Sequence, residues 1–362
     1  MFQQPLPMEI TQLSPEETAA RIKIARDKLG DEVVILGHHY QREEIIVWAD
    51  FRGDSFKLSQ IAAQQTANYI IFCGVHFMAE SADVLTSPEQ IVILPNLSAG
   101  CSMADMANIR QVEAAWCDIT SAVDEETLIP VTYVNSAANL KGFVGLHGGS
   151  CCTSSNAQRV LEWALERGER FFFFPDQHLG RNTAVEMGID PDTEMTLWNP
   201  HLPFGGTTPE ALKRSKVILW KGHCSVHGRF TVEQVTKARE DYPSVKVIVH
   251  PECTLEVVRA SDLNGSTERI IQVIDSSPAG STWAVGTEIN LVSRLQAENP
   301  DKKIFCLDPV ICPCSTMYRI HPHYLLWVLE NLVDGKVVNE VKVKPEVREW
   351  ARKSLERMLA VA

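Results

Sequence analysis

The segment VVILGHHY (residues 33–40) is a short apolar run that ends in a cluster of polar side chains. The same pattern recurs twice further along the chain, in IPVTYVN (129–135) and in VKVIVHPE (245–252). Apolar runs that do not alternate with polar residues are typical of strands in a parallel sheet covered on both faces. The three segments therefore predict three similar units, each built on its own parallel sheet.

Each of the three segments is followed by the same succession of features. A small motif with a hydroxyl side chain can open a helix, a second apolar strand such as YIIFCGV or RFFFF comes next, and the unit closes near a cysteine. Units packed around an axis would bring three thiols and three polar clusters together, as a metal centre inside a substrate cavity requires. The hydroxyl motifs are Gly53-Asp54-Ser55, Cys152-Thr153-Ser154 and Gly265-Ser266-Thr267, and the closing cysteines are Cys101, Cys224 and the pair Cys312 and Cys314.

The alternation of these strands with helical patterns places the chain in the α/β class. We expect three similar α/β/α units with short parallel sheets around a pseudo-threefold axis. An N-terminal helix and the first unit are expected in residues 1–115, the second unit in 116–243, the third in 244–330, and a C-terminal helical segment in 331–362. Residues 176–212 are rich in Gly, Pro and Thr, and they form the longest predicted irregular insertion, a candidate for mobility.

Two helices have readable ends. Ser14 and Glu17 form the signature of a capping box, and Gly30 is a plausible stop for the helix that follows them. The stretch SSNAQRVLEWALERG has a helical pattern. We expect Ser154 or Ser155 to cap this second helix.

Composition restricts the classes of protein that the chain can represent. The 362 residues are 45% hydrophobic and 22% charged, with a net charge of −12, which argues against a nucleic-acid or acidic-membrane surface. No signal peptide is recognisable, and the longest apolar stretch is too short to span a bilayer, so we expect a cytoplasmic protein. In that compartment the ten cysteines are better interpreted as thiols, ligands or core residues than as disulfides.

The hydroxyl motifs can bind an anion without a basic patch. Ser55, Ser154, Ser266 and Thr267 lie where helices begin, and the free backbone N–H groups of a helix N-terminus favour phosphate or carboxylate. In parallel α/β sheets, ligands bind beyond the carboxyl ends of the strands, where the polar clusters lie. The plain alternative is that these serines only cap their helices.

The cysteines differ in their surroundings. Cys101 and Cys224 lie among small and polar residues, as expected of a ligand loop, whereas Cys73 and Cys306 lie inside apolar strands and are expected in the core. Structural zinc sites usually use closely spaced pairs, so zinc is a weak interpretation. Three separate thiolates fit an iron–sulfur cluster with one open iron better. The third ligand stays open between the two cysteines of the Cys-Pro-Cys run.

Several side chains after the strands can carry acid–base chemistry. His250 and Glu252 flank a proline at a strand end, which suits a general acid/base pair, although a solvated loop is the plain alternative. Tyr40, Tyr133 and Asn135 can hydrogen-bond a carboxylate or an enol oxygen.

Eight motifs together resemble the quinolinate synthase family of bacterial NAD biosynthesis. The likeness extends in order from about Val34 to Leu329, through LGHHYQ, GDS, FCGVHFMAE, AGCSMAD, YVNSAA, CTSSNA, HPEC and GST. The resemblance implies three α/β/α units about a pseudo-threefold axis and a 4Fe–4S cluster held by three cysteines, with an open iron that acts as a Lewis acid. It also implies condensation of iminoaspartate with dihydroxyacetone phosphate to quinolinate, phosphate and water, with an aspartate oxidase or dehydrogenase upstream.

The family motifs also imply roles for single residues. Cys101 and Cys224 match the first two cluster ligands, and Cys314 matches the third because Met317 completes a Cys-x-x-Met pattern that Cys312 lacks. Glu252, Tyr40 and His38 match catalytic positions, and His227 is a lesser candidate. The implied substrate-binding residues are His38, Ser55, Tyr133, Asn135, Ser154, His250, Glu252, Ser266 and Thr267.

Two other functions share many of these features. Another hydro-lyase with an open iron–sulfur cluster would need the same thiols and the same anion sites, and only its substrate would differ. A non-catalytic iron–sulfur sensor would have a closed cluster with four thiolates and no deep anion-binding cavity. A zinc-stabilised α/β protein is a third alternative, and it would be colourless.

Overall fold

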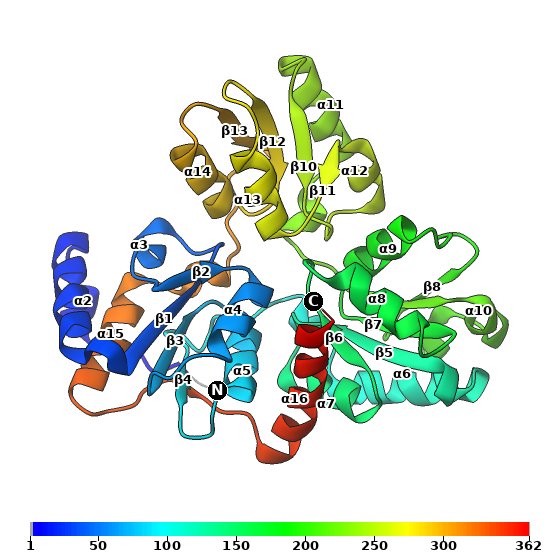
Figure 1. Cartoon of the computed structure of the whole chain (residues 1–362), viewed down its shortest axis with the longest axis horizontal. Coiled ribbons are helices and arrows are strands. Elements are labelled where there is room, and N and C mark those ends of the chain that lie inside the picture. The colour runs from blue at the N-terminus through cyan, green and yellow to red at the C-terminus, as the bar shows by residue number, and fades with distance from the viewer. Residues whose placement is uncertain (1–2, 362) are drawn as a thin grey trace. The chain divides into compact units, whose positions relative to one another are not determined.

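The computed structural model of the chain describes residues 3–361 and consists of two compact units. One unit contains the chain up to Cys101 together with Pro313–Lys344, and the other contains Ser102–Cys312 together with the segment from Pro345 onward. Three separate sheets, each accompanied by helices, make up the described chain (Figure 1). The predicted α/β class with three similar sheets is confirmed. The predicted pseudo-threefold axis and the boundaries at residues 115, 243 and 330 stay predictions.

The unit that contains the N-terminus is built on one five-stranded sheet. Its strand order is β14-β4-β3-β1-β2, in which only the short edge strand β14 is antiparallel to its neighbour. The strands are β1 (Val33–His38), β2 (Phe51–Gly53), β3 (Tyr69–Cys73), β4 (Ile91–Ile93) and β14 (Glu340–Val341), and the helices are α1 (Met8–Thr11), α2 (Pro15–Leu29), α3 (Glu43–Ile46), α4 (Ser55–Ala62), α5 (His76–Leu85) and α15 (Pro322–Val333).

The other unit contains two parallel sheets. Their strand orders are β6-β5-β7-β9-β8 and β11-β10-β12-β13. The first sheet consists of β5 (Leu128–Tyr133), β6 (Ser150–Cys152), β7 (Arg170–Phe174), β8 (Met195–Trp198) and β9 (Val217–Trp220), with helices α6 (Ile109–Ala122), α7 (Ala138–Leu146), α8 (Ala157–Leu165), α9 (Gln177–Glu186) and α10 (Pro209–Arg214). The second consists of β10 (Lys246–Val249), β11 (Leu263–Asn264), β12 (Thr282–Gly286) and β13 (Lys303–Cys306), with α11 (Val232–Asp241), α12 (Leu255–Ala260), α13 (Thr267–Asp275) and α14 (Ile289–Glu298); α16 (Pro345–Ala360) ends the chain.

The three sheets share one winding scheme. In each, the first strand lies between the second and the third: β1 between β2 and β3, β5 between β6 and β7, and β10 between β11 and β12. Chain connections run in opposite directions from such a strand, and ligands of doubly wound sheets bind beyond its carboxyl end. The polar clusters that the sequence analysis identified follow β1, β5 and β10. The fold therefore places each cluster where this class of sheet binds its ligand.

Strand β7 shows how a continuous apolar run becomes the centre of a sheet. All four of its phenylalanines are fully buried. Phe172 and Phe174 pack with α6 and α7 on one face, while Phe173 faces α9 so closely that a Cβ on Gly180 would lie 2.6 Å from its ring. Helices on both faces leave no solvated side, which explains why the strand has no polar alternation.

The C-terminal helix α16 supports the sheet that contains β5. It crosses α7 closely: a Cβ on Gly145 would lie 2.0 Å from the Trp350 carbonyl oxygen, so the packing requires glycine. Arg357 donates a hydrogen bond to the Gly149 carbonyl oxygen at 2.6 Å, and Asn156 donates to the Met358 carbonyl oxygen at 3.0 Å. The helix thereby fixes both ends of β6 and the loop that leads into α8.

Two predictions about local structure are confirmed and two are wrong. The capping box of α2 forms, with both hydrogen bonds between Ser14 and Glu17, and Gly30 follows its last residue. The segment 176–212 is not irregular, since it contains α9 and β8 and reaches into α10, and most of its glycines and prolines lie outside α9 and β8. Helix α8 is not capped by either serine, because Asn156 occupies the N-cap position.

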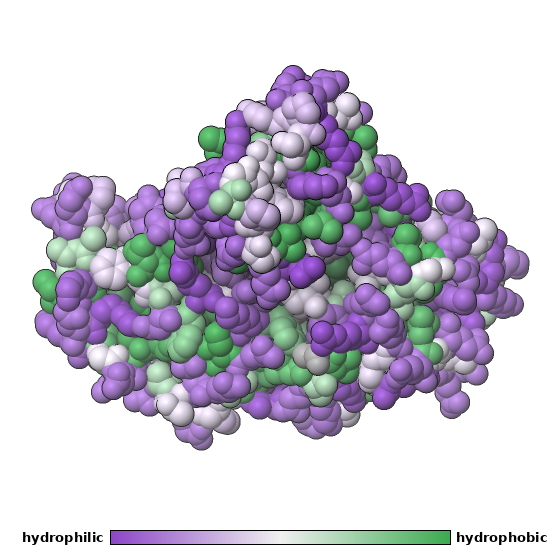
Figure 2. All heavy atoms as spheres, turned by 45° about the horizontal axis from the view of Figure 1, so that its top comes forward, coloured by the Kyte–Doolittle hydropathy of each residue, from purple (hydrophilic) through white to green (hydrophobic). Residues whose placement is uncertain are grey.

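The surface agrees with the polar composition. On the face that Figure 2 shows, hydrophilic side chains cover most of the outer surface, and hydrophobic residues form patches between them. None of the described helices combines the length and the apolar composition that a bilayer crossing requires.

Candidate active site

Three cysteines precede the same local structure. Counted from the residue after each cysteine, a 3₁₀ turn begins at the third residue, and the N–H of the fifth residue donates a hydrogen bond to the carbonyl oxygen of the second. The next helix begins at the eighth residue, and the side chain of the seventh residue caps it. Repetition of this loop in all three sheet systems indicates a common role. The cysteines are Cys101, Cys224 and Cys314, the turns are Ala104–Met106, His227–Arg229 and Met317–Arg319, the caps are Asn108, Thr231 and His321, and the helices are α6, α11 and α15.

The shared loop distinguishes the two cysteines of the Cys-Pro-Cys run. The Tyr318 N–H donates to the Cys314 carbonyl oxygen at 2.9 Å, just as the Gly228 N–H donates to that of Cys224 at 2.9 Å. Cys312 lies two residues further from the turn and is exposed. The local geometry therefore groups Cys314, and not Cys312, with Cys101 and Cys224.

The deeply buried cysteines are poor ligands by comparison. Burial raises the pKa of Cys73 to about 12 and that of Cys151 to about 11, and it raises the pKa of Cys152 and Cys253 well above the ordinary value. A thiol must lose its proton to bind a metal, so these four remain protonated packing residues. Cys101, Cys224 and Cys314, in contrast, are partly exposed.

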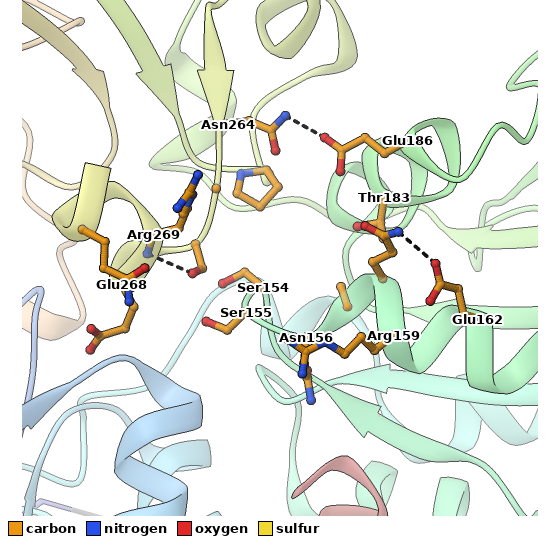
Figure 3. A pocket seen from close by; sticks show the side chains of 16 residues that line it. Ser154, Ser155, Asn156, Arg159, Glu162, Thr183, Glu186, Asn264, Glu268 and Arg269 are labelled. Carbon is orange, nitrogen blue, oxygen red and sulfur yellow. Dashed lines mark hydrogen bonds between the residues drawn. The ribbon is translucent and has the colours of Figure 1, made fainter. Parts of the chain in front are cut away.

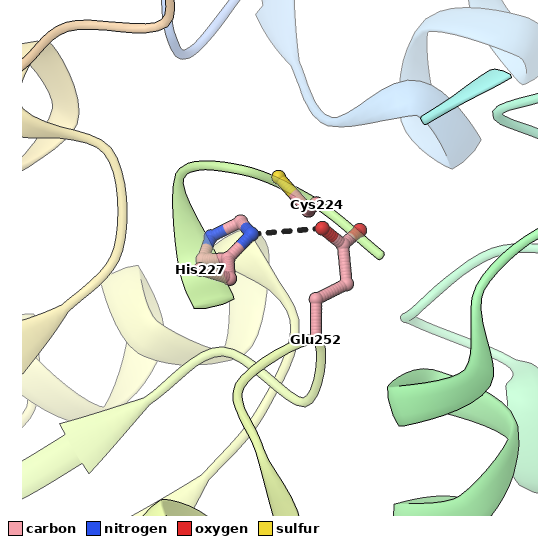
Figure 4. A group of neighbouring side chains, drawn as sticks. All are labelled: Cys224, His227 and Glu252. Atoms are coloured by element: carbon pink, nitrogen blue, oxygen red, sulfur yellow. Dashed lines mark hydrogen bonds and ion pairs between the residues drawn. The ribbon is translucent and has the colours of Figure 1, made fainter. Parts of the chain in front are cut away.

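The acidic side chain after β10 is the centre of a buried hydrogen-bond network. Glu252 is only 3% exposed, and its Oε1 accepts a hydrogen bond from the Tyr133 hydroxyl at 2.6 Å. Its Oε2 lies 2.8 Å from Nδ1 of His227, and Nε2 of the same ring lies 3.1 Å from the Thr287 hydroxyl. Cys224 completes the group, with its Sγ, a nitrogen of His227 and an oxygen of Glu252 all within 4.8 Å of one another (Figure 4).

These contacts determine the charge of Glu252. Burial alone would raise its pKa, but the neighbouring His227 and His250 and the hydrogen bonds from His227 and Tyr133 lower it below the usual range. Burial, together with His227, lowers the pKa of His250 to about 3 despite the opposing charge of Glu252. At neutral pH the site therefore contains an ionised Glu252 beside a neutral His250. An ionised carboxylate only accepts, so Nδ1 of His227 carries the hydrogen.

The turns after β1 and β10 repeat the same hydrogen bonds. The Tyr40 N–H donates to Nδ1 of His38 at 3.1 Å, and the Glu252 N–H donates to Nδ1 of His250 at 3.2 Å. The ring of Tyr40 meets that of His38 edge-on at a centroid distance of 4.7 Å. Each turn thus presents a buried histidine followed, two residues later, by a side chain able to exchange a proton.

Two of the predicted hydroxyl motifs line one cavity. A cavity of about 620 Å³ lies between the beginnings of α8 and α13, and Ser154 and Ser266 are among its lining residues (Figure 3). Ser266 caps α13 by accepting from the Arg269 N–H at 3.3 Å, so the plain alternative holds for this serine. It does not hold for Ser154, nor for Ser55, which is the first residue of α4 behind the N-cap Asp54.

One predicted side chain has a hydrogen-bond acceptor available for a ligand, and some residues near the site were not predicted from the sequence. Oδ1 of Asn135 is buried without a hydrogen-bond partner in the described structure, so it can accept from a bound molecule. His227 was underestimated, although its position in the cysteine loop could have indicated it. Thr287 carried no signal in the sequence. Asp176 carried one, because it follows an apolar strand as the polar clusters do.

Comparison with known proteins adds an independent line of support. A family model described as Quinolinate synthetase A protein matches residues 21–360. The chain is 62% identical over 360 residues to the quinolinate synthase of Corynebacterium glutamicum, with 99% of this chain and 91% of that protein covered. It is 55% identical over 361 residues to that of Rhodopirellula baltica (96% and 92% covered), and 53% identical over 361 residues to that of Anoxybacillus flavithermus (99% and 97% covered). The resemblance seen in the motifs is confirmed.

Substitution of His227 by phenylalanine tests the ionised state of Glu252. The variant keeps the burial of Glu252 but loses the hydrogen bond, so the pKa of Glu252 rises above the value of about 4.3 in an unfolded chain. Glu252 of the folded variant then binds a proton more readily than in the wild type. The free energy of unfolding is therefore lower than that of the wild type by about 3 kcal/mol at pH 7, and this difference shrinks as the pH falls towards 4. Urea unfolding at both pH values measures this difference.

Thr287→Val is the matched control. It removes the hydrogen bond to Nε2 of His227 and is expected to cost about 1 kcal/mol at either pH. An equal loss of stability at pH 7 and pH 4 in His227→Phe would contradict an ionised Glu252.

Proposed function

This chain belongs to the quinolinate synthetase A protein family, and we propose that it condenses iminoaspartate with dihydroxyacetone phosphate. The products are quinolinate, phosphate and two molecules of water. The observation that carries the proposal is the buried, ionised Glu252 between Tyr133 and His227. A reaction that forms an aromatic ring from two acyclic substrates needs repeated proton transfers, and an ionised carboxylate in a fixed position can accept these protons.

Glu252 is the group that takes and returns protons. As a carboxylate it removes a proton from a substrate carbon next to a carbonyl or imine, and the resulting acid then gives a proton to a departing hydroxyl. Tyr133 and His227 hold the two oxygens in fixed directions and reduce the cost of the buried charge. Neutral His250, whose Nδ1 accepts from the Glu252 backbone, keeps the turn rigid without adding a second charge.

Anionic parts of the substrates need donors, which the helix starts supply. The cavity lined by Ser154 and Ser266 lies at the N-termini of α8 and α13, whose backbone N–H groups favour phosphate and carboxylate. Thr267 is the first residue of α13, and Asn135 offers its amide to a carboxylate. These groups orient the substrates, which is worth several powers of ten in rate when the reacting atoms are well placed.

The family motifs also indicate functional groups in and after the turn that follows β1. We propose that His38 and Tyr40 exchange protons and hydrogen-bond substrate oxygens, because their turn repeats that of His250 and Glu252. Ser55 at the start of α4 is proposed as a third hydroxyl for an anion, since Asp54 already caps this helix.

The chemistry of the three cysteine loops fits an iron–sulfur cluster. Cys101, Cys224 and Cys314 are partly exposed, form no disulfide and occupy one repeated loop, and we propose them as the three ligands of a 4Fe–4S cluster. When bound, a cluster with one open iron supplies a Lewis acid that polarises a substrate oxygen or nitrogen. Glu252, which lies near Cys224, would act on the protons of the same molecule.

The substrates suggest the setting in which the enzyme works. Iminoaspartate hydrolyses readily in water, so an aspartate oxidase or dehydrogenase is proposed as its upstream source. Both substrates are small anions, and we propose a cytoplasmic enzyme that needs neither nucleic acid nor membrane.

Quinolinate formation can be measured directly. Protein reconstituted with iron and sulfide under anaerobic conditions is mixed with dihydroxyacetone phosphate and with iminoaspartate generated in situ from oxaloacetate and ammonia. We expect quinolinate and phosphate in equal amounts, and neither product when either substrate is omitted. Fully loaded protein that forms no quinolinate, or that dehydrates a different small acid, would contradict the proposed function.

Serine substitutions distinguish the two cysteines of the Cys-Pro-Cys run. Cys314→Ser should lose the cluster and quinolinate formation, because serine does not replace a thiolate ligand in the shared loop. Cys312→Ser, the matched control two residues away, should keep both. Iron and sulfide content and the EPR spectrum of the reduced protein provide the measurement. The reverse result would assign the ligand to Cys312.

A further inference from the structure

A second carboxyl group lies buried near Glu252 and has no part in the mechanism described above. Asp176 follows Phe174 and Pro175 at the end of β7 and is fully buried. Its Oδ1 accepts a hydrogen bond from the His178 N–H at 2.8 Å as the N-cap of α9, whereas its Oδ2 is buried without any hydrogen-bond partner in the described part of the chain. An N-cap needs only one oxygen, so capping leaves the second unexplained.

Helix α9 connects this carboxyl to the catalytic turn. Asn182 donates two hydrogen bonds, each of 2.8 Å, to the carbonyl oxygens of Pro251 and Cys253, on either side of Glu252. At the start of the helix, the Gln177 N–H donates to the Gly222 carbonyl oxygen at 2.9 Å, in the loop that leads to Cys224. Asp176 thus caps the helix that touches both loops of the site.

Asp176 and Glu252 are both buried and the charge of Glu252 acts on Asp176, so ionisation of both carries a large cost. The hydrogen-bond partners decide which of them keeps its proton. Glu252 receives hydrogen bonds from Tyr133 and His227 on its two oxygens, whereas Asp176 receives the His178 N–H on one oxygen and no partner on the other in the described structure. The negative charge is therefore better satisfied on Glu252.

The groups around Asp176 agree with this assignment. Burial and the charge of Glu252 raise the pKa of Asp176 well above its usual range, against the lowering by the His178 and Leu179 N–H groups and by Arg181. The other titratable neighbours, Cys152 at the end of β6 and Cys253 after β10, stay protonated because burial raises the pKa of each.

We propose that Asp176 is a positioning residue for Glu252: it remains a neutral carboxylic acid and thereby leaves the single negative charge of this pair of carboxyl groups on the catalytic base. The role rests on the proposed function, because the base and its anionic substrates belong to that reaction. Ionisation of Asp176 would add a second negative charge beside substrates that carry carboxylate and phosphate groups, and would weaken their binding.

The substitution Asp176→Asn separates this role from simple capping. Asparagine caps helices about as well as aspartate, has nearly the same volume, and imitates the neutral acid. In the wild type, Asp176 keeps a proton in the folded state, whereas the unfolded chain loses this proton above about pH 4. The free energy of unfolding of the wild type therefore falls as the pH rises, and Asp176→Asn lacks this fall. The melting temperature of the variant relative to the wild type should therefore rise with pH, by roughly 2 °C per pH unit between pH 5 and pH 8.

The catalytic readout is the pH profile of kcat/KM for quinolinate formation. The alkaline limb should move to higher pH by at least about one unit in Asp176→Asn, because no second charge can form there. Asp124→Asn is the control: this exposed aspartate caps the turn at Glu125–Thr127 through a 3.0 Å bond from the Glu126 N–H and should change neither readout.

Two results would overturn the proposal that Asp176 is a neutral positioning residue. A melting-temperature difference that does not change between pH 5 and pH 8 means that Asp176 is ionised in the folded protein, as it is in the unfolded chain above about pH 4, and only caps α9; this result overturns the proposal. A folded Asp176→Asn enzyme without turnover would make Asp176 a proton donor in its own right, which also overturns it. The melting temperatures need no turnover, so they test the proposal even if the enzyme makes a product other than quinolinate.

Discussion

A buried carboxylate is stable only where donors replace the water that it has lost, and the site depends on how the chain meets this constraint at Glu252. The two donors come from different places: Tyr133 from the end of β5, and His227 from the turn after Cys224. Tyr133 reaches Glu252 because the sheets that contain β5 and β10 pack in one compact unit. The same hydrogen bonds that join these sheets keep the base ionised, so stability and function rest on one network.

Repetition explains how one fold can provide so many groups. The histidine turn after β1 recurs after β10, and one cysteine loop occurs three times with the same spacing to its 3₁₀ turn and helix. A repeated unit places equivalent residues at equivalent positions of each sheet, so a change of side chain alters the chemistry without altering the backbone. Tyr40 and Glu252 hold the same place in their turns, yet one is a phenol and the other a carboxylate.

The sequence could predict the elements that long apolar runs specify. The runs containing Val33, Tyr69 and Phe171 became β1, β3 and β7, because strands covered on both faces require apolar residues at every position. Edge strands such as β2 and β11 were not foreseen, since segments of two or three residues contain no periodicity. Residues 176–212 were misread because the glycines and prolines in and around α9 and β8 masked the two elements.

Site residues could be predicted where the residue type itself indicates a chemical role. They could not be predicted where the role depends on contacts made in the folded structure. Glu252 and the cysteines were found because carboxylates and thiolates at strand ends are uncommon without a role. His227 gains importance only from the three-dimensional approach of its Nδ1 to Glu252, and Asp176 only from burial that leaves one oxygen without a partner. Such roles depend on contacts between segments far apart in the chain, which a single sequence does not contain.

The most direct measurement of the central claim is the rate of quinolinate formation by Glu252→Gln in a single turnover. Glutamine keeps an oxygen that can accept from Tyr133 but cannot take a proton, so the fold and the iron–sulfur content should stay as in the wild type. We expect the rate to fall about a thousandfold at equal cluster content, as the loss of a general base implies. A folded, cluster-loaded variant that forms quinolinate within tenfold of the wild-type rate would contradict Glu252 as the catalytic base.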